Sequence, residues 1–192
     1  KPGAIAMMQD SDTFLVGSTS SKVYKVAPDG NVEVYRSGGL LSSPGAIAYD
    51  DHGNLFIGNY YNGKIVKIDT NGTMTDFCNL PTSSLGRFAR IGHHLFVTGV
   101  FSHRIYRVNL LSGDWTLFAG TDKGSKDGKR NVATFDGPNG IAARDRKSVV
   151  EGKSVDLGGR RIIKKKRGRE EGERNEERYN ERVEIRSEMM RQ

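Results

Sequence analysis

The chain has 192 residues, of which 35% are hydrophobic, and a formal net charge of +7. This length accommodates one domain with a hydrophobic core, and no apolar run is long enough for a transmembrane helix. Cys78 is the one cysteine, which excludes an internal disulfide, and no Cys-x-x-Cys or Cys/His cluster predicts structural zinc.

Three kinds of segment recur along the chain. Pro-Gly-Ala-Ile-Ala occurs twice with a shift of 42 residues and is followed later by Pro-Asn-Gly-Ile-Ala. Between these copies lie a short apolar run and then an alternating segment such as Lys-Val-Tyr-Lys-Val. A fixed period of this kind indicates stacked structural repeats. The matching segments are 2–6, 44–48 and 138–142, then 15–17, 56–58 and 96–98, then 22–26, 64–68 and 104–108.

The unit at residues 44–78 shows the pattern most clearly. Its four apolar runs are separated by polar turns, and Asn71-Gly72 predicts a tight hairpin between the last two runs. Four antiparallel strands in one short repeat are typical of a propeller blade, whose faces are buried by neighbouring blades. We therefore predict an all-β fold: a partial β-propeller of about three four-stranded blades plus the first strand of a fourth.

Residues 1 to about 144 resemble NHL repeats and the related propellers of the gluconolactonase, strictosidine synthase and virginiamycin B lyase kind. The resemblance is carried by His-Arg-Ile-Tyr-Arg-Val at 103–108 and by the long stretch 119–142, which is similar to the family's inter-blade loop. The third unit departs from the pattern, because residues 85–97 lack the leading Pro-Gly-x-Ile-Ala. The resemblance implies a ring of six blades, so we expect this chain to be a fragment with uncovered blade faces.

The repeat stops after Ala143. Read back through the genetic code, residues 145–166 look like a translated short-read sequencing adapter that runs into poly-A. We therefore predict two parts, a propeller at 1–144 and an artefactual, highly charged tail at 145–192 that is disordered or helical. The alternative is a basic arm for nucleic acid at residues 164–167, but the acidic residues that follow cancel much of its charge.

Enzymes among the related propellers imply a divalent ion in the central channel, held by Glu, Asn and Asp from different blades. Asn59 is the best placed oxygen ligand here, but its repeat equivalents, Ser18 and Gly99, offer nothing comparable. A turn or edge role is therefore expected for Asn59. No metal-binding or catalytic residue and no cofactor is predicted for this chain, although calcium or another divalent ion is open for the full-length parent.

The four histidines are likewise not predicted to bind a metal ion or to take part in catalysis. His52 lies in a turn, His103 occupies a position where NHL repeats carry His for turn or packing reasons, and adjacent His93 and His94 have poor geometry for joint chelation. No Gly-x-Ser-x-Gly elbow or phosphate-binding loop occurs. Hydrolysis by a serine nucleophile and nucleotide binding are therefore not predicted.

Aromatic residues recur at strand positions and are expected in the blade core. Tyr60 and Tyr61 stand together beside a turn, so with Asn59 they are the binding candidates, while rim or core packing is the alternative for them. The residues expected in the core are Phe14, Tyr24, Phe56, Phe77, Phe96, Trp115 and Phe118.

The preferred function is a module that binds a protein or small-molecule ligand on a propeller face, without enzymatic activity in this fragment. The alternative is a fragment of a metal-dependent lactonase, hydrolase or lyase. Nucleic acid is not expected as a partner, because residues 1–144 show no dense basic stripe. We expect a soluble protein with no membrane segment; the compartment is not assigned, and an extracytoplasmic parent stays open.

Overall fold

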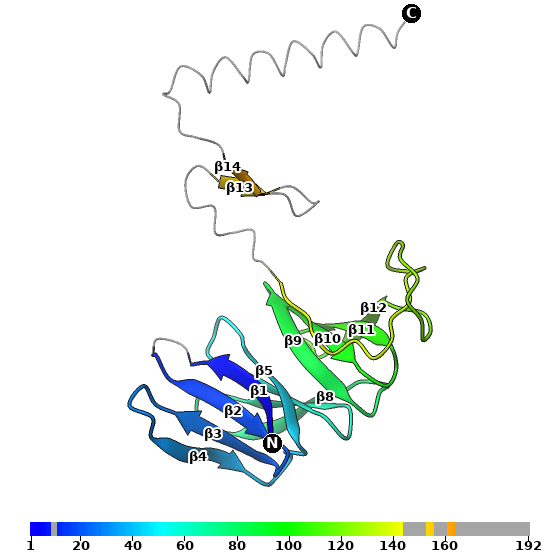
Figure 1. Ribbon diagram of the computed structural model, residues 1–192. Coiled ribbons are helices and arrows are strands. Elements are labelled where there is room, and N and C mark those ends of the chain that lie inside the picture. Colours follow the sequence, from blue (N-terminus) through cyan, green and yellow to red (C-terminus); the bar gives the residue numbers. More distant parts are fainter. Residues whose placement is uncertain (9–10, 144–152, 156–160, 164–192) are drawn as a thin grey trace, which may run out of the picture. The chain divides into compact units, whose positions relative to one another are not determined.

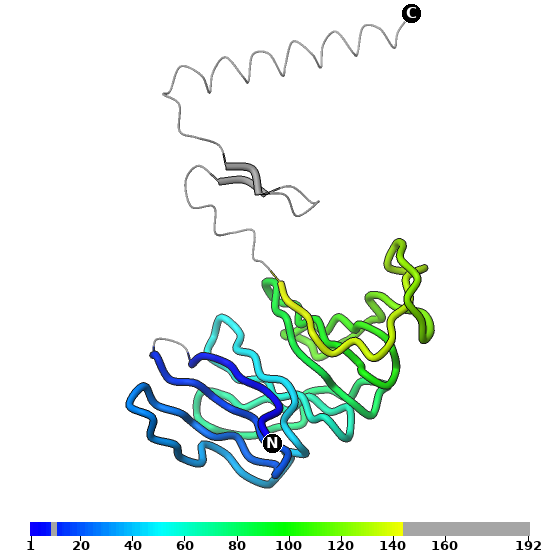
Figure 2. The backbone as a smooth tube through the Cα atoms, viewed as in Figure 1, coloured from blue at the N-terminus to red at the C-terminus, as the bar shows by residue number. Residues whose placement is uncertain are grey.

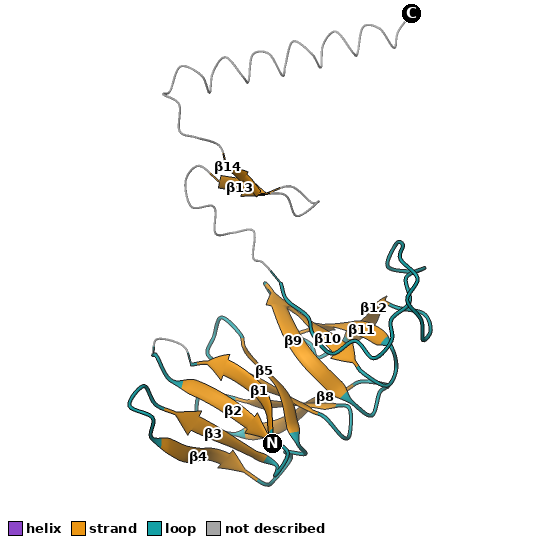
Figure 3. Cartoon of the chain, viewed as in Figure 1, coloured by secondary structure: helices purple, strands orange, loops and turns teal. Residues whose placement is uncertain are grey.

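The computed structural model describes residues 1–8, 11–143, 153–155 and 161–163. The chain divides into two compact units, Lys1–Asp145 and Arg146–Gln192. The described residues form strands and loops and contain no helix (Figure 3). Among them, therefore, no helix is long and apolar enough to cross a membrane.

Three four-stranded antiparallel sheets make up the first unit, and we call them blades 1, 2 and 3 (Figure 1). In each blade, the strands pair in the order in which they follow one another in the sequence. The strands are β1 (Pro2–Met7), β2 (Phe14–Ser18), β3 (Lys22–Val26) and β4 (Val32–Ser37) in blade 1; β5 (Pro44–Tyr49), β6 (Leu55–Asn59), β7 (Lys64–Ile68) and β8 (Met74–Asn79) in blade 2; and β9 (Leu85–Ile91), β10 (His94–Gly99), β11 (Arg104–Asn109) and β12 (Trp115–Ala119) in blade 3.

The same backbone bonds recur in all three blades. The residue after the second strand donates its N–H to the residue just before the first strand, from Thr19 to Lys1 (3.1 Å) and from Tyr60 to Ser43 (3.0 Å). In blade 3, Val100 donates the equivalent bond to the Ser84 carbonyl (3.0 Å). Blade 3 therefore has the repeat architecture although its first strand lacks the Pro-Gly-x-Ile-Ala sequence. The partial β-propeller predicted from the repeats is confirmed.

The core lies between blades rather than within them. One cluster of buried residues joins blades 1 and 2, and a second joins blades 2 and 3. Blade 2 thus buries both faces, because alternate residues of a strand point to opposite sides of the sheet. The first cluster is Ala4, Leu15, Val23, Leu41, Ile47, Leu55, Ile57 and Ile68; the second is Phe56, Ile65, Leu80, Leu85, Leu95, Val97, Tyr106, Val108 and Leu110.

The expected aromatic core is only partly observed. Phe56 is fully buried, but Phe14 and Trp115 each remain 39% exposed. Phe14 lies on the face of blade 1 that points away from blade 2, and no described residue range supplies a further blade to cover it. Trp115 lies on the outermost strand of blade 3, where its ring packs edge-on against Tyr106 at 5.7 Å between centroids. The prediction that both are core residues was therefore wrong.

Residues 138–143, predicted to be the first strand of a fourth blade, are not paired as a strand. Figure 2 traces the long loop after β12 as it returns beside blade 3. The hydroxyl of Thr98 donates a hydrogen bond to the Asn139 carbonyl (3.3 Å), and the side-chain oxygen of Asn139 lies close to Gly86. The segment therefore lies beside the first strand of blade 3, but the described residues provide no second strand for it to pair with.

The described part of the predicted tail is a short hairpin, β13 (Lys153–Val155) paired with β14 (Arg161–Ile163). These six residues are strands rather than the disordered or helical structure that we expected for the tail. A hairpin of two three-residue strands has little stability of its own. The rest of the tail prediction, including the basic cluster at 164–167, concerns residues outside those described.

Blades 1 and 2 approach closely at Gly17. A Cβ atom at this position would lie 2.6 Å from the Pro44 carbonyl oxygen, whereas a Cβ at Gly140 would meet no atom within 4 Å. We expect Gly17→Ala to lower the free energy of unfolding by about 1–3 kcal/mol, because the blades must shift apart. Gly140→Ala should change it by less than about 0.5 kcal/mol. Urea denaturation of both variants tests this, and equal stabilities would contradict the close packing.

Candidate functional site

Asn59, the candidate oxygen ligand, is fully buried at the end of β6. Its side-chain oxygen accepts a hydrogen bond from the Ser42 N–H (2.9 Å), and its amide nitrogen donates to the Leu40 carbonyl (2.8 Å). Both bonds go to the loop that connects blade 1 to blade 2. The side chain therefore uses its polar groups to fix this loop, as a buried amide must to offset its desolvation.

Tyr60 and Tyr61 lie in the turn after β6, and Phe101 lies in the turn after β10. The Tyr60 ring contacts Tyr61 edge-on at 5.2 Å and Phe101 edge-on at 6.3 Å between centroids. Tyr61 and Phe101 are 64% and 63% exposed. We call Tyr60, Tyr61 and Phe101 the aromatic platform, because together they present three rings from two adjacent blades.

The backbone holds this platform at several points. Tyr60 donates its N–H to the Ser43 carbonyl, and Phe101 donates its N–H to the hydroxyl of Ser84 (3.0 Å), which is itself buried. The Asn59 side chain fixes the neighbouring inter-blade loop through its hydrogen bonds to Leu40 and Ser42. The platform residues are thus attached to the ends of paired strands rather than to a long loop, and little ordering remains when a ligand binds.

Phe101 was not among the predicted binding residues. A signal for it exists in the sequence, because Asn59 and Gly99 are repeat equivalents and therefore Tyr61 and Phe101 are equivalent too. The corresponding residue in blade 1 is Ser20, so the aromatic character is confined to blades 2 and 3. The exposure of these rings could not be obtained from the repeat alone.

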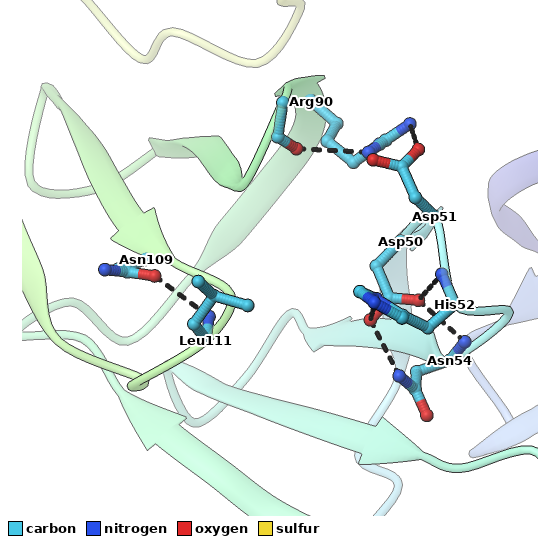
Figure 4. A network of polar contacts seen from close by, with 8 residues as sticks. Asp50, Asp51, His52, Asn54, Arg90, Asn109 and Leu111 are labelled. Atoms are coloured by element: carbon cyan, nitrogen blue, oxygen red, sulfur yellow. Dashed lines mark hydrogen bonds and ion pairs between the residues drawn. The ribbon is translucent and has the colours of Figure 1, made fainter.

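The opposite ends of the strands carry a polar network (Figure 4). Asp50 organises the turn between β5 and β6 by accepting hydrogen bonds from the N–H groups of His52 and Asn54, both at 2.9 Å. The adjacent Asp51 forms an ion pair with Arg90 of β9 at 2.8 Å, which links blade 2 to blade 3. The hydrogen bond and charge of Arg90 lower the pKa of Asp51.

His103 anchors the long loop after β12. The backbone of His103 has a positive φ of 56°, and the Nδ1 atom of its ring accepts a hydrogen bond from the Gly137 N–H (3.0 Å). The carboxylate of Asp136 lies 3.8 Å from the same nitrogen. This agrees with the turn role expected for the residue, because the ring binds backbone rather than facing an open site.

His52 lies 4.0 Å from Asp50 within the β5–β6 turn, His93 lies in the turn before β10, and His94 is the first residue of that strand. The charges of His52 and His93 contribute to the lowered pKa of Asp51, with smaller effects than Arg90. No group of three or more His, Cys, Asp or Glu side chains in the described ranges is placed to hold a metal ion. Cys78 is largely enclosed, and burial raises the pKa of its thiol to about 12, so the thiol stays protonated at neutral pH.

Comparison with known proteins identifies the fold. No family model and no curated protein matches the chain. A structural genomics protein of unknown function from Bacteroides thetaiotaomicron matches with a TM-score of 0.66 and 17% identity over 80% of this chain and 43% of that one. An auxiliary nutrient binding protein from Bacteroides ovatus matches with a TM-score of 0.62 and 17% identity over 79% and 40%.

A third similar structure is virginiamycin B lyase from Staphylococcus aureus, with a TM-score of 0.57 and 18% identity over 82% of this chain and 53% of the lyase. The chain thus spans only 40% to 53% of the length of these three structures. Three consecutive four-stranded sheets with these likenesses define a β-propeller protein. At such low identity the likeness establishes the fold and leaves the activity open.

Replacement of Asn59 tests its role in the inter-blade loop. Asn59→Asp retains an acceptor for the Ser42 N–H but cannot donate to the Leu40 carbonyl while it is ionised, and it buries a charge. We expect the free energy of unfolding at pH 7 to fall by about 1–3 kcal/mol or more. Chemical denaturation measures this. A variant as stable as the original chain would show that the two hydrogen bonds do not hold the loop.

The ion pair between Asp51 and Arg90 predicts a dependence on pH. Because the pKa of Asp51 is lowered in the folded state, the pair stabilises the fold above the ordinary aspartate pKa of about 3.9, and this contribution is lost as the pH falls through the lowered value. NMR titration of the Asp51 carboxyl should show the low pKa, and Arg90→Gln should raise it. The same pKa in both proteins would contradict the assignment.

Proposed function

We propose that this chain is part of a propeller module that binds a ligand through the aromatic platform. The observation that carries the proposal is the exposure of Tyr61 and Phe101 beside the half-buried Tyr60 on two adjacent blades. Exposed aromatic rings that cluster are uncommon unless they contact a partner. Such rings contribute a large contact area and lose little side-chain entropy on binding.

The nutrient binding protein from Bacteroides ovatus supports this class of function, since its propeller has a similar fold. The similarity to virginiamycin B lyase keeps an enzymatic parent, such as a metal-dependent lactonase, hydrolase or lyase, as the alternative. Among the described residues, no observation favours that alternative over binding, whereas the platform is a formed surface. We therefore assign Tyr60 and Tyr61, together with Phe101, to ligand contact, and Asn59 to their support.

We also infer that residues 1–144 belong to a six-bladed ring of the NHL or gluconolactonase-like kind, and that residues 145–192 lie outside it. Three blades within about half the length of the similar structures support a parent of this size. The compact unit Lys1–Asp145 supports the boundary. The position of Asn139 beside Gly86 supports a repeat that continues past the third blade.

A thermal-shift screen of the full chain against monosaccharides, oligosaccharides, amino acids and short peptides tests the binding function. A ligand at 100 times its dissociation constant adds about 2.7 kcal/mol to the free energy of unfolding, so a specific ligand raises the melting temperature measurably. We expect the double variant Tyr61→Ser, Phe101→Ser to lose this shift while it unfolds at nearly the same temperature as the original chain in the absence of ligand.

Leu111→Ser is the matched control, because Leu111 is 68% exposed but lies in the β11–β12 turn, at the opposite ends of the strands. This variant should retain the full shift. A screen in which no compound raises the melting temperature, or a shift that persists in the double variant, contradicts the platform as the binding surface.

A further inference from the structure

A cavity of about 220 Å³ lies between blades 1 and 2, at the opposite ends of the strands from the aromatic platform. Its floor is the buried pair Leu55 and Ile68, and its walls come from β4 and from the turns that follow β5 and β7. The lining residues are Met8, Tyr35, Arg36, Tyr49, Gly53, Leu55, Ile68, Asp69, Thr70 and Gly72.

Comparison with the next interface explains why this space is open. Strand β11 of blade 3 is equivalent to β7 of blade 2. The residue that follows β11 is Leu110, which is 5% exposed and belongs to the core between blades 2 and 3. Its equivalent in blade 2 is Thr70, which is exposed. Similarly, Phe56 of blade 2 packs edge-on against Phe77 at 5.0 Å, whereas the equivalent of Phe56 in blade 1 is the smaller Leu15.

Hydrogen-bond donors are present on four of the side chains that line the open cavity, those of Tyr35, Arg36, Tyr49 and Thr70. Arg36 stacks over the Tyr35 ring at 4.4 Å and donates from one nitrogen to the Tyr35 carbonyl (2.7 Å), while its second terminal nitrogen lies beside Gly72. Burial, with a smaller contribution from Tyr35, raises the pKa of Tyr49 to about 12, so that its hydroxyl stays protonated and able to donate.

Asp69 is the acidic residue among those that line the cavity, and its carboxylate is already engaged. One of its oxygens accepts hydrogen bonds from the N–H groups of Asn71 (2.9 Å) and Thr73 (2.8 Å), which orients the group toward its own turn. Arg36 is the basic residue among those that line the cavity, and one terminal nitrogen of its guanidinium group lies beside Gly72. An acceptor with a negative charge complements this group.

We propose that the cavity binds a small carboxylic acid with a flat apolar body. The carboxylate interacts with Arg36 and with the hydroxyls of Tyr35 and Tyr49, and the apolar body covers Leu55 and Ile68. The arrangement is typical of small-molecule sites, in which an apolar floor gives contact area and a few polar groups fix the orientation. This site is independent of the proposed platform function, because no residue is shared between them.

Benzoate is a suitable probe, with benzyl alcohol as the uncharged analogue of the same shape. In the full chain labelled with ¹³C on the methionine methyl groups, benzoate should shift the Met8 signal in a saturable manner, because Met8 lines the cavity. The Met7 signal should not move, since Met7 is 56% exposed and lies outside the cavity. Benzyl alcohol should bind about tenfold or more weakly, because it lacks the charge.

Two variants test the assignment. Thr70→Leu introduces the residue found at the filled interface and should abolish the Met8 shift, whereas Thr75→Leu, on the exposed side of β8, should leave it unchanged. Arg36→Gln should weaken benzoate about tenfold or more and leave benzyl alcohol unaffected. The proposal is overturned if benzoate gives no saturable shift, if it binds Thr70→Leu as well as the original chain, or if the two probes bind equally.

Discussion

Face-to-face packing of adjacent sheets is the interaction on which the rest of this structure depends. Successive side chains of each strand point to opposite faces of the sheet, and here both faces carry apolar residues. The backbone hydrogen bonds within one blade leave both of these faces exposed to water. Leu15 and Val23 of blade 1 are buried only because Ile57 and Ile68 of blade 2 lie against them. Blade 2, with neighbours on both sides, is the best-buried part of the chain, and its strand β6 is buried along its whole length.

This packing also determines where functional groups can be placed. The strands fix two sets of turns at opposite ends of each blade, and the close approach of blades through glycine brings turns of neighbouring repeats together. At one end, the rings of Tyr60 and Phe101 meet across the boundary between blades 2 and 3. At the other end, Asp51 and Arg90 pair across the same boundary. Each of these contacts exists because two repeats are adjacent, not because either repeat contains a motif.

The sequence predicted the fold well, because a repeat constrains many residues at once. The segments at 44–48 and 64–68 became β5 and β7, and blade 3 formed despite its divergent first strand, since the backbone bonds at Ser43 and Ser84 do not depend on side-chain identity. The site was harder to predict. A turn or edge role was expected for Asn59, and the structure places its buried side chain at the end of β6, where its partners, Leu40 and Ser42, lie in an inter-blade loop without a sequence signature. Phe14 and Trp115 were misassigned because periodicity shows which residues share a face and not which faces are covered.

The two core clusters have no residue in common, although both use blade 2. Neighbouring repeats therefore interact through separate compartments, and a change of volume in one compartment reaches the other only through the backbone of a single sheet. The energetic effects of substitutions in the two compartments should be close to additive, as nearest-neighbour coupling in a linear array requires. Leu110 is buried at one interface while its equivalent Thr70 is exposed at the other, so the two interfaces of one chain can differ in how closely they are packed.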